Sequence, residues 1–281
     1  MLKQKAIISL LRLLAKLPLR VAHGLGFLLG WIIYLTHKKH ARLIQQNLKS
    51  SLLASNPLSF KQILHKNVGE TGKALLETFA IWFKPYQKLE NFYQGCSGWE
   101  HVESALKSKR GIIFLTPHLG CFEITSLYYG QFYPIAVLFR PPRQPWLMPL
   151  IQEGRQRGQV SLAPANQQGV KQLLQALKRG EAIGILPDQA PYQGEGEWAP
   201  FFGRPAYTMT LASKLAEKTG AQVLMAFGER LPKGRGYHIH IEPIEAGGVA
   251  TPILLNQSIE KAIAKCPSQY MWAYDRYKVR G

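Results

Sequence analysis

A histidine and a carboxylate lie five positions apart in the segment TPHLGCFE, residues 116–123. In a regular α-helix five residues turn the chain by about 500°, which would leave the side chains of His118 and Glu123 about 140° apart. The two side chains can meet only if His118 precedes the helix and projects from a turn, which Pro117 and Gly120 permit. A carboxylate on one ring nitrogen fixes the tautomer and makes the other nitrogen a general base near neutral pH. The spacing therefore predicts His118 and Glu123 as a catalytic pair.

The segments around this motif alternate between strands and helices. Strands are predicted at 111–116, 134–139, 182–186, 221–227 and 237–242, and helices at 59–83, 100–109, 120–129, 145–157, 169–179, 208–219 and 252–265. This alternation predicts an α/β fold with a mostly parallel sheet flanked by helices, in which sites form at the carboxyl ends of the strands. His118, Arg140 and Asp188 each follow a predicted strand, and so does the segment 228–230.

Composition and missing motifs exclude several classes of protein. With 281 residues and 46% hydrophobic side chains, the chain is globular rather than fibrous or disordered. The sequence lacks GxxxxGK[ST], GxGxxG, GxSxG and HExxH, so neither a cofactor nor a metal is predicted. Cys96, Cys121 and Cys266 form no CxxC pair, which fits a reducing cytoplasm. Cys121 is interpreted as packed rather than nucleophilic, because nothing near it in sequence would lower its pKa.

Positive charge is concentrated near the N-terminus. Lysine and arginine number 35 against 17 aspartates and glutamates, a formal net charge of +18, and no acidic residue precedes Glu70. The apolar run at 21–35 has fifteen residues, short of the roughly 20 that span a bilayer. We expect an uncleaved anchor that lies in the face of an anionic membrane, with Trp31 and Tyr34 as interfacial rings. A spanning helix and an ordinary buried helix are the alternatives.

The HLGCFE segment resembles the H-x4-D/E motif of membrane acyltransferases, and the longer resemblance is to the lipid A biosynthesis lauroyl/myristoyl acyltransferase family. This resemblance covers nearly the whole chain, including FRP at 139–141, LPDQ at 186–189, PFFG at 200–203 and the block at 256–280. It implies a glycerolipid-acyltransferase-like fold. It also implies transfer of a fatty acyl chain from acyl carrier protein to a hydroxyl of a phosphorylated lipid A precursor.

Three further residues are candidates for substrate binding. Arg140 is expected to clamp acceptor phosphates, although an arginine in a proline-rich loop can also be solvated. Arg155 matches the family's arginine, which implies a brace for an oxyanion or a phosphate, and its alternative is a surface helix position. Asp188 is expected to order its loop through backbone N–H groups, with a substrate role as the alternative.

These observations predict an anchor at residues 1–50 and an acyltransferase domain at 51–281, on the cytoplasmic face of the inner membrane. Deletion of residues 1–35 is expected to leave a soluble enzyme with reduced activity. The expected partners are acyl carrier protein, a lipid A precursor or related glycolipid, and an anionic membrane surface, but no nucleic acid. The alternatives are a different glycolipid or phospholipid acceptor, or a basic protein without catalytic activity that binds membranes or nucleic acid. The sequence leaves open the acyl chain length, the acylated position and coenzyme A as donor.

Overall fold

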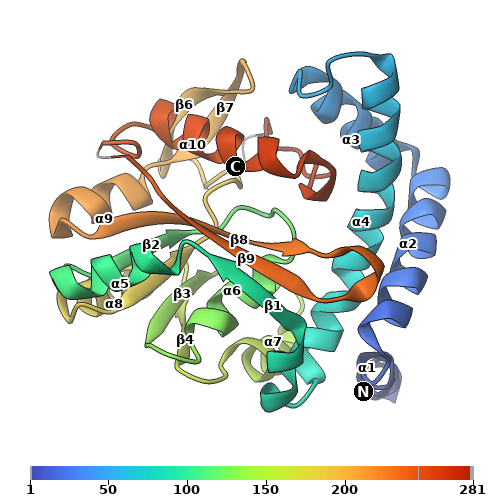
Figure 1. Ribbon diagram of the computed structural model, residues 1–281, viewed down its shortest axis with the longest axis horizontal. Helices are drawn as coiled ribbons and strands as arrows, with labels where there is room; N and C mark the ends of the chain where they lie inside the picture. Colours follow the sequence, from blue (N-terminus) through green and yellow to red (C-terminus); the bar gives the residue numbers. More distant parts are fainter. Residues whose placement is uncertain (1, 246, 279–281) are drawn as a thin grey trace.

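The computed structural model describes residues 2–245 and 247–278. Four helices come first and stand together beside the rest of the molecule (Figure 1). They are α1 (Leu2–Ala15), α2 (Leu19–Thr36), α3 (Lys38–Ser50) and α4 (Pro57–Phe83). The helix predicted at 59–83 is therefore confirmed, and Asn56 caps it by accepting a hydrogen bond from the Ser59 N–H at 2.9 Å.

A seven-stranded sheet of order β1-β9-β8-β2-β5-β3-β4 forms the centre of the molecule. Its strands are β1 (Tyr93–Ser97), β2 (Ile112–Leu115), β3 (Ile135–Phe139), β4 (Val160–Pro164), β5 (Ala182–Ile185), β8 (Gln222–Arg230) and β9 (Tyr237–Pro243). Neighbouring strands are parallel except for β8 and β9, which are antiparallel. The predicted α/β fold with a mostly parallel sheet is thus confirmed. A separate antiparallel hairpin is formed by β6 (Gly196–Phe201) and β7 (Arg204–Met209).

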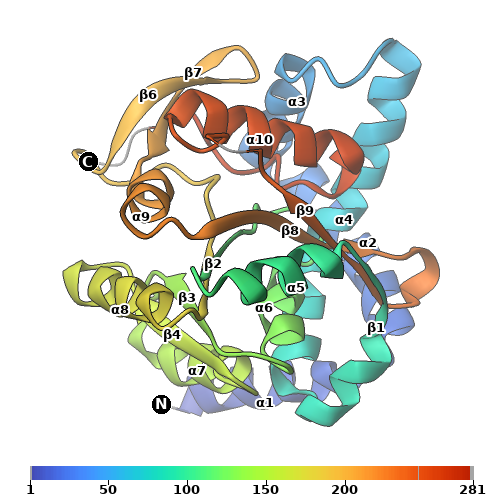
Figure 2. The same ribbon diagram turned by 60° about the vertical axis from the view of Figure 1, so that its left-hand side comes forward.

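Helices cover both faces of the sheet (Figure 2). They are α5 (Trp99–Ser108), α6 (Phe122–Tyr129), α7 (Met148–Arg155), α8 (Gln167–Lys178), α9 (Leu211–Thr219) and α10 (Pro252–Lys265), with short 3₁₀ turns at Tyr86–Phe92, Pro145–Leu147, Pro232–Gly234 and Pro267–Gln269. In β2, Ile113 and Leu115 pack into the core with α8, α9 and α10, whereas Ile112 and Phe114 pack with α5 and α6. Burial on both faces explains why this strand is a continuous apolar run.

The sequence analysis does not predict four of the strands, and it begins one helix too early. The strands β1 and β4 lie at the two edges of the sheet, and β6 and β7 form the outlying hairpin, so their burial is irregular and leaves no clear apolar pattern. The helix predicted at 208–219 begins only at Leu211, because residues 204–209 pair with β6.

Close backbone contact joins α2 to α4. A Cβ atom added to Gly30 would lie 2.1 Å from the Val68 carbonyl oxygen, and one added to Gly72 would lie 2.0 Å from the Gly26 carbonyl oxygen. Only glycine allows two helices to approach this closely. Helices on the two sides of the boundary predicted at residue 50 therefore pack as one layer, and the division into an anchor and a catalytic domain stays a prediction.

The face of α2 turned away from α4 is apolar. By length and composition α2 is suited to cross a membrane, with a mean hydropathy of 1.4 and 28% of its residues buried. Its exposed apolar side chains follow one another at spacings of four and three residues: Val21, Leu25, Leu28, Ile32 and Leu35. This spacing places them on one face of the helix. On α1 the side chains of Ile7, Leu10 and Leu13 are exposed as well. We call these eight residues the apolar stripe.

Candidate active site

The turn between β2 and α6 carries His118, as predicted. Gly120 has φ +61°, and a Cβ atom there would lie 2.1 Å from the Gly228 carbonyl oxygen. The turn is pinned to the neighbouring strand β8 because the Cys121 N–H donates to that same carbonyl at 2.7 Å. Glycine at position 120 is thus required both by the left-handed backbone and by the close approach of β8.

Asp188 holds both the ring and the backbone of His118. Its Oδ1 atom lies 2.8 Å from Nδ1 of His118, and its Oδ2 atom accepts the His118 backbone N–H at 2.9 Å. Asp188 is 2% exposed and follows β5, the strand that pairs with β2. Burial alone raises the pKa of this carboxyl, but the charge of His118 and its hydrogen bonds outweigh burial and hold the pKa of Asp188 below its usual value. An ionised Asp188 accepts a hydrogen bond from Nδ1–H, so Nε2 is the nitrogen with a free lone pair.

Glu123 lies in the first turn of α6, and its carboxylate binds partners other than the His118 ring. Its Oε2 atom accepts hydrogen bonds from Nε1 of Trp82 at 3.1 Å and from Nε of Arg155 at 2.8 Å, while Oε1 pairs with the second arm of the Arg155 guanidinium. Burial lowers the pKa of Arg155, but the adjacent carboxylate outweighs burial and raises it. The expected contact between Glu123 and His118 is therefore corrected: Asp188 takes that place, and Glu123 forms a buried ion pair with Arg155.

A cavity of about 730 Å³ opens beside the His118 ring. Its wall includes Phe122, Gln189 and the side chains of Arg140 and Arg155. The Gln189 amide nitrogen lies 3.2 Å from Nε2 of His118, so it can donate to the free lone pair of that nitrogen. Any group that binds the lone pair of Nε2 must therefore displace this amide.

Arg140 follows β3, as predicted, and lines the same cavity. Its guanidinium lies over the ring of Tyr192, with Cζ 4.7 Å from the ring centroid. The Nη1 atom of Arg140 is buried and makes no hydrogen bond to any residue that the structure describes. An unpaired buried guanidinium N–H is costly, and an anion in the cavity would satisfy it.

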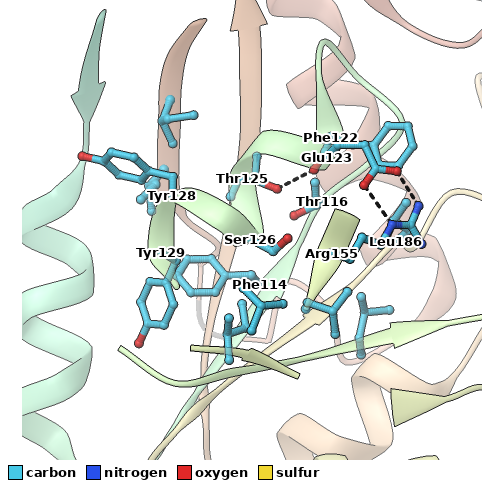
Figure 3. A pocket seen from close by; sticks show the side chains of 18 of the residues that line it. Phe114, Thr116, Phe122, Glu123, Thr125, Ser126, Tyr128, Tyr129, Arg155 and Leu186 are labelled. Carbon is cyan, nitrogen blue, oxygen red and sulfur yellow. Dashed lines mark hydrogen bonds and ion pairs between the residues drawn. The ribbon is translucent and has the colours of Figure 1, made fainter. Parts of the chain in front are cut away.

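A second, narrow cavity of about 40 Å³ lies behind the ion pair of Glu123 and Arg155. In Figure 3 the Arg155 guanidinium meets the Glu123 carboxylate at one end of it, and Phe114 and Tyr129 lie further along the wall. Most of this wall is apolar and comes from the sheet and from α6. Phe122, Arg155 and Leu186 line both cavities, so the ion pair stands where the two cavities meet.

Cys121 is 2% exposed, and burial raises the pKa of its thiol well above the usual value. A buried, protonated thiol is a poor nucleophile, which agrees with its interpretation as a packed residue. Phe201 is likewise buried in the core and is not itself among the residues that line the two cavities.

The H-x4-E motif thus lies on a turn between a central strand of an α/β fold and a helix, which agrees with the acyltransferase resemblance of the sequence. Residues 3–279 match the bacterial lipid A biosynthesis acyltransferase family, and the chain belongs to this family. The protein is therefore an acyltransferase.

Three relatives from Escherichia coli (strain K12) illustrate the similarity. A lipid A biosynthesis lauroyltransferase is 28% identical over 279 residues, covering 97% of this chain and 90% of the relative. A lipid A biosynthesis palmitoleoyltransferase is 26% identical with the same coverage. A lipid A biosynthesis myristoyltransferase is 25% identical over 189 residues, covering 65% of this chain and 58% of the relative.

Sequence reasoning missed three features of the site. It placed Asp188 at the end of a strand but not beside His118, although parallel neighbouring strands would have brought them together. Gln189 and Trp82 were not singled out for the site. Gln189 lies in the LPDQ segment, whereas Trp82 comes from α4, 41 residues before Glu123, and no local pattern in the sequence indicates that contact.

Proposed function

We propose that this protein transfers a fatty acyl chain from the thioester of acyl carrier protein to a hydroxyl of a phosphorylated lipid A precursor. The observation that carries this proposal is the pair of His118 and Asp188 at the wall of the 730 Å³ cavity. Membership of the family supports the reaction class and lipid A biosynthesis as its setting. The acyl carrier protein and the residue roles below are our inference.

His118 acts as the general base. Its Nε2 atom removes the proton from the acceptor hydroxyl as the hydroxyl oxygen attacks the thioester carbonyl carbon. The carbon–sulfur bond then breaks, and the proton on the imidazolium passes to the departing thiolate. Asp188 stabilises the imidazolium in between and keeps Nε2 directed into the cavity. A thioester is already activated, so this chemistry needs no covalent acyl-enzyme.

Gln189 and Arg155 assist at the reacting carbonyl. The Gln189 amide sits at Nε2 before substrate binds and is free to donate to the developing oxyanion once the hydroxyl has displaced it. Arg155 is held by Glu123 at the junction of the two cavities, where its positive charge favours the same negative oxygen. In this account Glu123 fixes Arg155 and does not touch the base.

Arg140 binds a phosphate of the acceptor. The unpaired Nη1 atom supports this role, since phosphate is a good partner for a guanidinium fork. Lys171 and Lys214 line the same cavity and add positive charge, and Glu195 is an acidic residue on its wall. Arg140 and these two lysines against one carboxylate make the cavity wall suited to an anion.

The apolar stripe lies on the membrane. The eight exposed side chains of α1 and α2 favour burial among lipid tails, and the basic residues that follow α2, such as Lys38 and Lys39, favour anionic headgroups. We assign the protein to the cytoplasmic face of the inner membrane, where acyl carrier protein is available. Residues 1–50 then form the membrane-associated part and residues 51–281 the acyltransferase domain.

The test uses the full-length protein in detergent with acyl carrier protein thioester and a lipid A precursor. We expect loss of the thioester only when acceptor is present, with a product heavier by one acyl chain. His118→Ala should lower the rate about 10²–10⁴-fold. Loss of thioester at the same rate without acceptor would contradict the proposal.

Two further arms of the same assay test the partners. Coenzyme A thioester in place of the carrier protein should react more slowly if the carrier is recognised. An acceptor stripped of phosphate should raise the KM of the wild-type protein but not of Arg140→Lys, whose KM is already raised. Equal rates with a phospholipid acceptor would favour the alternative substrate.

A further inference from the structure

A cluster of charged side chains is buried away from the two cavities, where α2 and α4 meet β8 and β9. Nε of Arg230 donates to the Glu77 carboxylate at 2.7 and 2.8 Å, and Nη1 lies 3.2 Å from Glu70. Nε2 of His23 lies 3.0 Å from Glu77, and the Tyr237 hydroxyl donates to Glu77 at 2.9 Å. Arg230, Glu77 and His23 are each less than 5% exposed.

Arg230 also reaches the turn that carries His118. Its Nη2 atom donates to the Gly120 carbonyl oxygen at 2.6 Å. The side-chain amide of Gln269 accepts the Arg230 backbone N–H at 2.8 Å and donates to the Arg230 carbonyl at 3.0 Å. The backbone carbonyl of Gln269 accepts the Gly120 N–H at 3.1 Å. The peptide groups of Gly120, two residues from His118, are thus fixed directly by Arg230 and through Gln269.

A buried ion pair is a weak means of stabilising a fold, because removing two charges from water opposes their attraction. Apolar side chains could fill the same space between helices and sheet. The cluster is charged, and its cation has one arm on the turn of His118. That turn is also fixed by the Asp188 side chain and by backbone contacts with β8 and with the segment 269–271. A charged group with a fixed donor geometry suits the positioning of a carbonyl better than it suits packing.

We propose that Arg230 is a positioning residue for His118 and that α2 and α4 are its support. Glu77 on α4 and His23 on α2 fix the guanidinium, the guanidinium fixes the Gly120 carbonyl, and the turn then holds His118 at Asp188. This role rests on the proposed function of His118. It makes the first helices part of the frame of the active site, in addition to any contact they make with a membrane.

Two asparagines support the other side of the same turn from α3 and α4. The Asn67 amide donates to the carbonyl oxygens of Ser268 and Tyr270 at 2.9 and 2.8 Å, and the Met271 N–H in turn donates to the His118 carbonyl at 3.1 Å. The Asn47 amide donates to the Trp272 and Tyr274 carbonyls at 2.9 and 3.0 Å. A deletion of residues 1–35 would remove His23 but neither asparagine, and the reduced activity expected for that deletion stays a prediction.

Arg230→Lys tests the proposal, since lysine keeps the charge but cannot bridge Glu77 and Gly120 as a planar fork. We expect kcat to fall about 10- to 100-fold with both KM values unchanged, because the binding walls are intact and only the base is displaced. Arg157→Lys is the matched control. Arg157 is also partly buried and donates to backbone carbonyls, at 2.7 Å to Lys84 and 3.0 Å to Gly154. We expect Arg157→Lys to change the thermal midpoint but not kcat.

His23 supplies a second pair of variants in case Arg230→Lys fails to fold. His23→Gln retains a side-chain N–H donor for Glu77 and should keep the wild-type kcat. His23→Leu removes that donor and should lower kcat, as Arg230→Lys does. A drop in kcat that Arg157→Lys shares, or wild-type kcat in both Arg230→Lys and His23→Leu, would overturn the positioning role.

Hydrogen exchange of residues 118–123 gives a readout that needs no substrate. Arg230→Lys should speed exchange in this segment, and Arg157→Lys should leave it unchanged. Unaltered exchange in Arg230→Lys would contradict the proposal. If the wild-type protein transferred no acyl chain, the proposed function would fail while the exchange measurement still judged whether Arg230 fixes the turn.

Discussion

At the scale of single residues, the site depends on which carboxylate meets which cation. The five-residue spacing suggested that Glu123 orients His118, and the structure gives this position to Asp188, 70 residues further along the chain. Glu123 instead holds Arg155 beside Trp82. In the proposed mechanism the two carboxylates therefore have separate tasks, one at the base and one at a cation.

This division predicts different kinetics for the two acidic residues. Glu123→Gln leaves His118 and Asp188 paired but frees Arg155, so kcat should fall while its pH dependence stays that of the wild type. Arg155→Lys should reproduce that loss, because lysine cannot make the paired contact with the carboxylate. The check is a pH–rate profile for each variant. A displaced lower limb for Glu123→Gln would mean that Glu123 acts on the base after all.

At the scale of helices and strands, the sequence predicted local turns better than it predicted which strands lie side by side. Pro117 and Gly120 were sufficient to predict a turn with His118 before the helix, because that prediction depends on adjacent residues. The pairing of β2 with β5, which brings Asp188 to His118, depends on the order of strands in the sheet. No pattern within either strand encodes that order, since both are plain apolar runs. The edge strands β1 and β4 were missed because irregular exposure hides their period.

The contact between α2 and α4 yields a prediction at this scale. Gly30→Ala adds a Cβ atom 2.1 Å from the Val68 carbonyl and must push the helices apart, which costs about 1–3 kcal/mol of the free energy of unfolding. Gly24→Ala is the matched control, since nothing lies within 4 Å of its added Cβ and alanine favours the helix. Thermal midpoints should fall for Gly30→Ala and hold or rise for Gly24→Ala. A thermal midpoint that falls for Gly24→Ala but not for Gly30→Ala would show that the two helices do not pack at this distance.

At the scale of the whole molecule, the apolar stripe and the buried cluster lie on opposite faces of α2. Leu28 and Ile32 are 60% and 58% exposed in the stripe, and each is worth about 1.5–3 kcal/mol when fully buried. The double variant Leu28→Glu/Ile32→Glu should therefore bind anionic vesicles at least tenfold more weakly. Trp198→Glu, an equally exposed aromatic position on β6, should bind as the wild type does. If the wild type, the double variant and Trp198→Glu sedimented equally with vesicles, the apolar stripe would not contact the membrane.

The buried cluster also makes stability depend on pH. Burial by itself raises the pKa of Glu77, but the charge of Arg230 and the hydrogen bonds from His23 and Arg230 lower it to about 2. A depressed pKa means that the stabilisation is present above the ordinary carboxyl pKa of about 4.5 and is lost as the pH falls toward 2. The thermal midpoint of the wild type should decline over this range, and that of Glu77→Gln/Arg230→Met should decline less. Parallel curves would mean that Glu77 is not ionised in the folded protein.

In the proposed mechanism Asp188, and not Glu123, orients His118 as the base. The most direct measurement is kcat of Asp188→Asn beside His118→Ala and Glu123→Gln in the acceptor-dependent assay. Asparagine retains the size and the contact with the His118 backbone but no longer stabilises the imidazolium. We predict that Asp188→Asn loses roughly 10²–10⁴-fold, close to His118→Ala, with KM nearly unchanged, and that Glu123→Gln loses less. An Asp188→Asn protein within tenfold of the wild type, with Glu123→Gln as inactive as His118→Ala, would contradict the account.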